Sequence, residues 1–162
     1  MVIRDSIIKM QSKLGEEVIK DLFGGIKLYA GDKLIDGGGL ALPRFNAVVI
    51  DLEKIDFTIS EMESMLSKTR DYRVGDQSDL VDNPDIHKAL ELSIVHEFGH
   101  ILEYKKYGDV DRGFAGLNQD DAPTEYGSKS PREDYAESWM YYIYGGQLDD
   151  SRRKIIEGDV NL

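Results

Sequence analysis

One helical motif constrains this 162-residue chain more than any other feature. The stretch His96-Glu97-Phe98-Gly99-His100 has the form HExxH and lies within a continuous helical pattern. Two histidines four residues apart lie on one face of an α-helix, about one turn apart, so both rings can reach one metal ion. The adjacent Glu97 can accept a proton from a water molecule on that ion. The motif predicts a catalytic Zn²⁺ site, which normally takes a third protein ligand.

Composition predicts a single folded domain over residues 1–162. Hydrophobic residues make up 41% of the chain, which is enough for one core at this length. The absence of cysteine excludes disulfides, cysteine-bound zinc and a thiol nucleophile. A net charge of −11 argues against nucleic acid or an anionic membrane as a partner. We interpret this charge as a source of solubility, with attraction of a basic peptide as the alternative.

The sequence shows no targeting feature. No apolar run reaches the length of a membrane span. The first ten residues include Arg4, Asp5 and Lys9, and they contain neither the apolar h-region nor the small-residue cleavage site of a secretory signal. We therefore expect a cytoplasmic protein, a protein exported by a route without such a signal, or a fragment of a longer chain. No pattern indicates the oligomeric state.

The first half of the chain predicts a helix followed by a small sheet. Apolar residues spaced by three and four predict a helix over 1–23. β-like segments over 26–30 and 33–35 and a strand over 46–52 predict a small, mostly antiparallel sheet. The glycines at 37–39 lack the Lys and Ser/Thr of a phosphate loop, so they predict a turn.

The second half predicts mainly helices. A short helix is expected over 60–70 from two capping-box patterns, and a long helix over 85–107 carries the HExxH motif. A loop over 108–130 is long enough to be expected beside a functional site. Helices then follow over 131–144 and 149–157, and the tail after Gly158 is expected to be loose.

Three regions offer candidates for the third metal ligand. His87 lies nine residues before His96, about 900° of rotation at roughly 100° per residue, which places it on the opposite helix face. Glu103 lies two turns from His96, so we expect it either to contact a metal ligand without binding the metal or to face solvent. Glu133 and Glu137 share one face of the next helix, so one can bind the metal and the other can orient a ligating histidine.

Each of these glutamates also has a plainer interpretation. Glu133 is also the glutamate of a capping box, and the plain alternative for Glu137 is a glutamate that faces solvent. Gly99 costs about 1 kcal/mol of helix propensity relative to alanine. Its presence indicates either close approach by a neighbouring element near the metal or simple tolerance. Glu103 and Lys106 stand where the metzincin extension has Gly and His, which excludes that class.

Taken together, the HExxH motif, Tyr126-Gly127 and the segment Glu133-Asp-Tyr-Ala-Glu137 resemble a known family. They resemble the catalytic domain of anthrax lethal factor and its relatives, including the Pro-Pro endopeptidases, which are gluzincin metallopeptidases. The resemblance covers residues 96–140. It implies one zinc ion, with these roles: His96, His100 and Glu133 as ligands, Glu97 as the base, Tyr126 facing the reacting carbonyl, and Glu137 as a partner of a ligand.

We therefore expect an α+β, zincin-like domain in which a small sheet packs on the long HExxH helix. The expected activity is that of a zinc metalloendopeptidase acting on a peptide or protein. One alternative is a zincin-fold interaction module without catalysis, and another is a toxin-like effector protease with the same chemistry. Glu97 argues against the first alternative, because zinc binding alone does not need it.

Overall fold

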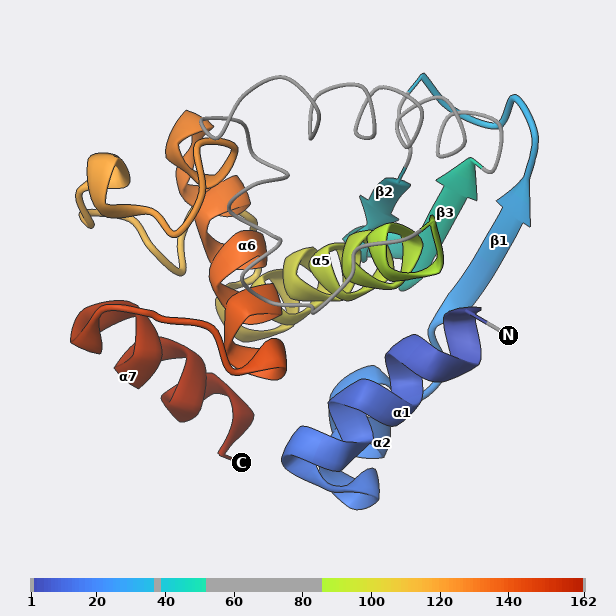
Figure 1. Cartoon of the computed structure of the whole chain (residues 1–162), viewed down its shortest axis with the longest axis horizontal. Helices are drawn as coiled ribbons and strands as arrows, with labels where there is room; N and C mark the ends of the chain where they lie inside the picture. The colour runs from blue at the N-terminus through green and yellow to red at the C-terminus, as the bar shows by residue number, and fades with distance from the viewer. Residues whose placement is uncertain (1, 37–38, 52–85, 162) are drawn as a thin grey trace.

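The computed structural model describes residues 2–36, 39–51 and 86–161, which form an α+β fold (Figure 1). Its helices are α1 (Val2–Leu14), α2 (Glu16–Phe23), α5 (Ile86–Tyr107), α6 (Pro131–Tyr144) and α7 (Asp150–Val160). Its strands are β1 (Lys27–Gly31), β2 (Gly39–Leu42) and β3 (Ala47–Asp51), and short 3-10 turns are η1 (Pro43–Phe45), η2 (Gln119–Asp121) and η3 (Gly127–Lys129). The helix predicted over 60–70 lies outside the described residues.

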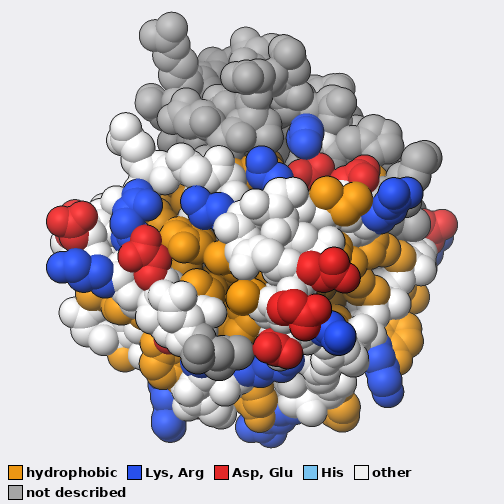
Figure 2. Space-filling model, turned by 90° about the horizontal axis from the view of Figure 1, so that it is seen from below, with side chains coloured by type: hydrophobic (Ala, Val, Ile, Leu, Met, Phe, Trp, Pro, Cys, Tyr) orange, Lys and Arg blue, Asp and Glu red, His pale blue; other side chains and the backbone are white. Residues whose placement is uncertain are grey.

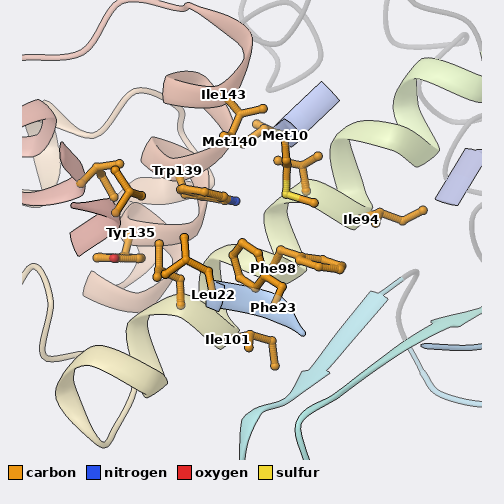
Figure 3. Close-up of a cluster of buried hydrophobic side chains, with 14 of the residues drawn as sticks. Met10, Leu22, Phe23, Ile94, Phe98, Ile101, Tyr135, Trp139, Met140 and Ile143 are labelled. Atoms are coloured by element: carbon orange, nitrogen blue, oxygen red, sulfur yellow. The ribbon is translucent and has the colours of Figure 1, made fainter. Parts of the chain in front are cut away.

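Helix α5 is the central element, as the HExxH pattern predicted. It runs through the middle of the molecule, with the sheet on one side and α6, α1 and α2 against its other faces (Figure 1). Many of the core side chains come from these helices and meet in one cluster (Figure 3): Met10, Leu22, Phe23, Ile94, Phe98, Ile101, Tyr135, Trp139, Met140 and Ile143. Phe23 makes edge-to-face contacts with both Phe98 and Trp139, at centroid distances of 4.9 and 5.7 Å.

The N-terminal segment forms two helices, whereas one was predicted over 1–23. Gly15 separates them with φ +92° and ψ 152°, a backbone conformation that is essentially restricted to glycine. Buried residues on both sides of the break, among them Met10 and Leu22, continue the apolar pattern. The periodicity therefore predicted the buried face correctly and could not show the break.

The sheet is mixed, so the prediction of a mostly antiparallel sheet was wrong. Its strand order is β1-β3-β2, with β3 parallel to β1 and antiparallel to β2. Strands close in sequence favour antiparallel hairpins, and β2 and β3 do form one through η1. However, β3 inserts between β2 and β1, and this places it alongside β1 in the same direction.

Residues 33–35 do not form a strand. The backbone N–H groups of Leu34 and Ile35 donate to Oδ2 of the buried Asp51, at 2.6 and 3.1 Å. A side-chain carboxylate therefore accepts the hydrogen bonds that a neighbouring strand would otherwise have received.

The two C-terminal helices begin and end at recognisable caps. The Ser130 side chain accepts a hydrogen bond from the backbone N–H of Glu133 at the start of α6, and Gly145 ends that helix with φ +78°. Helix α7 continues to Val160, which is buried, so the predicted loose tail was wrong. Ile156 and Val160 lie one turn apart and both pack into the core, which holds the last turn in place.

Surface charge is distributed around an apolar area on the face shown in Figure 2. Apolar side chains gather toward its middle, and acidic and basic side chains are interspersed around them. Among the helices that the structure describes, none combines the length and the apolar character needed to cross a bilayer.

Candidate metal centre

Helices α5 and α6 bring three potential metal ligands together. His96 and His100 of α5 and Glu133 of α6 each offer a ligand atom, and these atoms lie within 4.8 Å of one another. Glu133 Oε2 is 3.1 Å from His96 Nε2 and 3.5 Å from His100 Nε2. Two ligands placed tetrahedrally around zinc at about 2.0–2.1 Å are about 3.3 Å apart. The group could therefore hold a metal ion with little rearrangement.

Gly99 allows α6 to approach the motif helix this closely. A Cβ atom at position 99 would lie 2.8 Å from the Ala136 Cα and 3.1 Å from the Trp139 ring. Real side chains do not tolerate such a distance to backbone, so only glycine fits here. Close approach by a neighbouring element, one of the two interpretations of this glycine, is confirmed.

Glu137 is buried and contacts a candidate ligand. Its Oε1 lies 2.6 Å from His96 Nδ1, and its side chain is 0% exposed. This contact holds the imidazole with Nε2 toward the cluster, as carboxylates commonly do for metal-bound histidines. The other carboxylate oxygen accepts a hydrogen bond from the Thr124 hydroxyl at 2.7 Å. The alternative of a solvent-facing Glu137 is wrong.

The metal-free cluster favours a proton on His96 and a charge on Glu133. Burial lowers the pKa of His96, but hydrogen bonds to Glu133 and Glu137 and the charges of Glu137 and Glu97 outweigh it and raise the pKa to about 10. Burial also raises the pKa of Glu133, and hydrogen bonds from His100 and His96 more than reverse this, to well below the ordinary range. A cation is thus already favoured at the position that a metal ion would take.

Glu97 lies against the start of β2. A Cβ atom at Gly39 would be 2.6 Å from Glu97 Oε1, so glycine at this position leaves room for the carboxylate. Gly39 was predicted to lie in a turn, whereas it is the first residue of a strand beside the candidate base. The run of three glycines was the available signal for this position. It could not show that Gly39 makes room for Glu97, because the two residues are distant in sequence.

An open cleft of about 480 Å³ lies over these side chains. His96, Glu97, His100 and Glu133 line it together with Tyr126, whose ring centroid is 5.8 Å from that of His96. All the residues predicted to act on substrate or metal therefore face one space. The segment 39–45 forms another part of the lining and presents exposed apolar side chains, with Leu40 42% and Phe45 73% exposed.

The other two candidates for the third ligand, Glu103 and His87, are both in α5. Glu103 is fully buried, and it accepts a hydrogen bond from the backbone N–H of Gly113 at 2.9 Å. Burial raises its pKa to about 7, although backbone hydrogen bonds lower it. The expectation that Glu103 faces solvent, one of two for this residue, is wrong, because the side chain is buried. Its carboxyl group instead holds the loop after α5 through the Gly113 N–H. His87 lies in the first turn of α5, and its side chain is outside the described part of the chain.

Comparisons with protein-family models, with curated proteins and with solved structures found no match to this chain. The resemblance to gluzincins carried by residues 96–140 therefore stays a prediction, and the geometry of the cleft carries the functional inference.

Proposed function

We propose that this chain is a zinc-dependent metalloendopeptidase of the gluzincin type with a zincin-like fold. The observation that supports this most is the convergence of His96, His100 and Glu133 in one cleft with Glu97. Two histidines and one carboxylate are a common ligand set of catalytic zinc and leave a fourth position open, whereas structural zinc sites use four protein ligands.

The chain's own groups divide the proposed reaction between them. Zinc, when bound, would supply Lewis acidity that lowers the pKa of a coordinated water molecule and polarises the substrate carbonyl. Glu97 accepts a proton from the attacking water and passes it to the leaving amine. The Tyr126 hydroxyl donates a hydrogen bond to the oxygen on which negative charge develops. Glu137 keeps the His96 ring turned so that Nε2 is available to the metal.

The position of β2 supports a peptide as the substrate. This strand is at one end of the strand order in the described sheet, and its residues line the cleft. An extended peptide can add to such an edge through backbone hydrogen bonds. The exposed Leu40 and Phe45 side chains would then offer apolar contact to the side chains of the bound peptide.

Zinc content and peptide cleavage, compared between wild type and Glu97→Gln, test the proposal. We expect one zinc ion in both proteins and cleavage of a broad peptide library only by the wild type, with at least a 100-fold loss in the variant. Zinc in both proteins without cleavage by either would favour the interaction module. Equal cleavage by both would exclude Glu97 as the base.

A further inference from the structure

A buried hydroxyl in the loop before α6 contacts both Glu137, the partner of His96, and the turn that follows Tyr126. Thr124 is 3% exposed, and its Oγ1 donates to Glu137 Oε2 at 2.7 Å. The same oxygen accepts a hydrogen bond from the backbone N–H of Gly127 at 2.9 Å, and the Thr124 carbonyl accepts one from the backbone N–H of Ser128 at 3.1 Å. Gly127 and Ser128 directly follow Tyr126, so Thr124 holds the turn that carries this tyrosine.

These contacts form one continuous chain of hydrogen bonds. It runs from the Gly127 N–H through the Thr124 hydroxyl to one oxygen of Glu137, and from the other oxygen to Nδ1 of His96. A hydroxyl has a single proton, so donation to Glu137 fixes its orientation and leaves a lone pair for the Gly127 N–H. Because these groups are buried, leaving one of them unpaired is costly, and the arrangement is strongly specified.

The packing around Gly127 specifies the same arrangement. A Cβ atom at position 127 would lie 3.2 Å from the Ala122 Cβ and 3.3 Å from Thr124 Oγ1. The turn after Tyr126 therefore lies directly against Thr124, and the Tyr126 ring in turn lies 5.8 Å from that of His96.

We propose that Thr124 is a positioning residue that ties the orientation of His96 to the placement of Tyr126. Through Glu137 it fixes the ring of a metal ligand, and through Gly127 it fixes the turn that carries the oxyanion donor. The part concerning Tyr126 rests on the proposed peptidase function. The part concerning His96 requires only metal binding and can be measured without a substrate.

Two substitutions of Thr124 separate the effect of its hydroxyl from that of the rest of the side chain, and a third substitution in the same loop is a control. Thr124→Val keeps the shape of the side chain and removes its hydrogen bonds, whereas Thr124→Ser keeps the hydroxyl. Ser128→Ala is the matched control, because the Ser128 hydroxyl lies in the same loop and donates to the exposed Glu125 carbonyl instead. Thr124→Ala, which leaves room for a water molecule, replaces the valine variant if that variant does not fold.

Zinc affinity, measured by competition with a chelator, is the first readout. We expect Thr124→Val to bind zinc about tenfold more weakly, which is the lower end of the range for loss of a direct partner of a metal-bound histidine, because Thr124 acts on His96 through Glu137. The zinc affinities of Thr124→Ser and Ser128→Ala should stay within about twofold of the wild-type value. If packing alone mattered, Thr124→Ser, which loses a methyl group, would weaken zinc binding as well. Wild-type zinc affinity in Thr124→Val would overturn the proposed link to His96.

The second readout is peptide cleavage in a double-mutant cycle with Tyr126→Phe. If Thr124 acts through Tyr126, Thr124→Val lowers kcat strongly in the wild type and much less in Tyr126→Phe. Additive losses would overturn the link to Tyr126. If the wild type cleaves no peptide, the proposed function fails and the Tyr126 link fails with it. A zinc affinity lost in Thr124→Val and restored in Thr124→Ser would still support the link to His96.

Discussion

Two glutamates one turn apart in α6 take different roles because they lie at different depths. Glu133 is in the first turn, its side chain is 17% exposed, and its Oε2 lies near Nε2 of both histidines. Glu137 is one turn further along, its side chain is 0% exposed, and its carboxylate contacts Nδ1 of His96. Only Glu133 therefore faces the atoms that a metal ion would use.

We predict that removal of Glu133 weakens zinc binding far more than removal of Glu137. Glu133→Ala removes a proposed ligand, whereas Glu137→Ala removes a contact to the far side of the His96 ring, which typically costs 10- to 100-fold in metal affinity. Metal titration of both variants against a chelator measures the order. Glu137→Gln, which keeps the buried side chain's size, controls for the cavity left by alanine. The reverse order would contradict the ligand assignment.

Local sequence was sufficient for residues whose roles depend on helical spacing. The HExxH motif and the Glu133–Glu137 pair could be placed on helix faces, and the structure brings these faces together. Thr124 and Gly39 could not be predicted in the same way. Their roles come from contacts with Glu137 and Glu97, which are distant in sequence and depend on how loops and strands fold over the helices.

At the scale of elements, the site depends on how closely α5 and α6 pack. Gly99 lies next to His100, and its hypothetical Cβ meets the backbone of Ala136, the neighbour of Glu137. A change in the separation of the two helices would therefore move the carboxylates relative to the histidines. The packing of the two helices and the spacing of the candidate ligands are therefore set by the same contact.

We predict that Gly99→Ala destabilises the fold and weakens zinc binding. Alanine gains about 1 kcal/mol of helix propensity, but overpacking against Ala136 and Trp139 costs about 1–3 kcal/mol and separates the helices. Gly158→Ala in α7 is the matched control, since a Cβ there meets nothing within 4 Å and should stabilise the chain slightly. Urea unfolding and chelator competition measure both effects. A Gly99→Ala protein with wild-type zinc affinity would contradict this account.

Helices were easier to predict than the sheet for a physical reason. Apolar periodicity and caps are local, so α5 and α6 were predicted within a residue or so of their observed ends. Strand order depends on which segments meet in space, and the insertion of β3 between β1 and β2 leaves no local signal. The break at Gly15 was missed because the apolar pattern continues across it.

At the scale of the whole molecule, α7 braces the helices that carry the candidate site. Buried Arg152 of α7 donates to Asp134 of α6 at 2.8 Å, next to Glu133. Asp159 of α7 accepts hydrogen bonds from the hydroxyls of Tyr107 and Tyr135, which belong to α5 and α6. The C-terminal helix thus holds both site helices on the side away from the sheet.

The same region contains the group that should dominate one part of the pH dependence of folding. Glu103 is buried beside the loop after α5, near Asp111 and Tyr107. Burial raises its pKa to about 7 from an ordinary value of 4.5. Between these pH values the folded chain keeps a proton that the unfolded chain has released, so the free energy of unfolding falls as pH rises through this window.

We predict that Glu103→Gln removes this loss of stability. Glutamine stays neutral, so only the wild type should lose stability through this group. The unfolding free energy of the wild type minus that of the variant should fall by about 3 kcal/mol at most as pH rises from 4.5 to 7. Above pH 7 the difference should stay constant. Urea unfolding of the metal-free proteins at several pH values measures it, and histidine titration cancels because both proteins share it. A difference that is independent of pH would show that Glu103 ionises in the folded chain as it does in water.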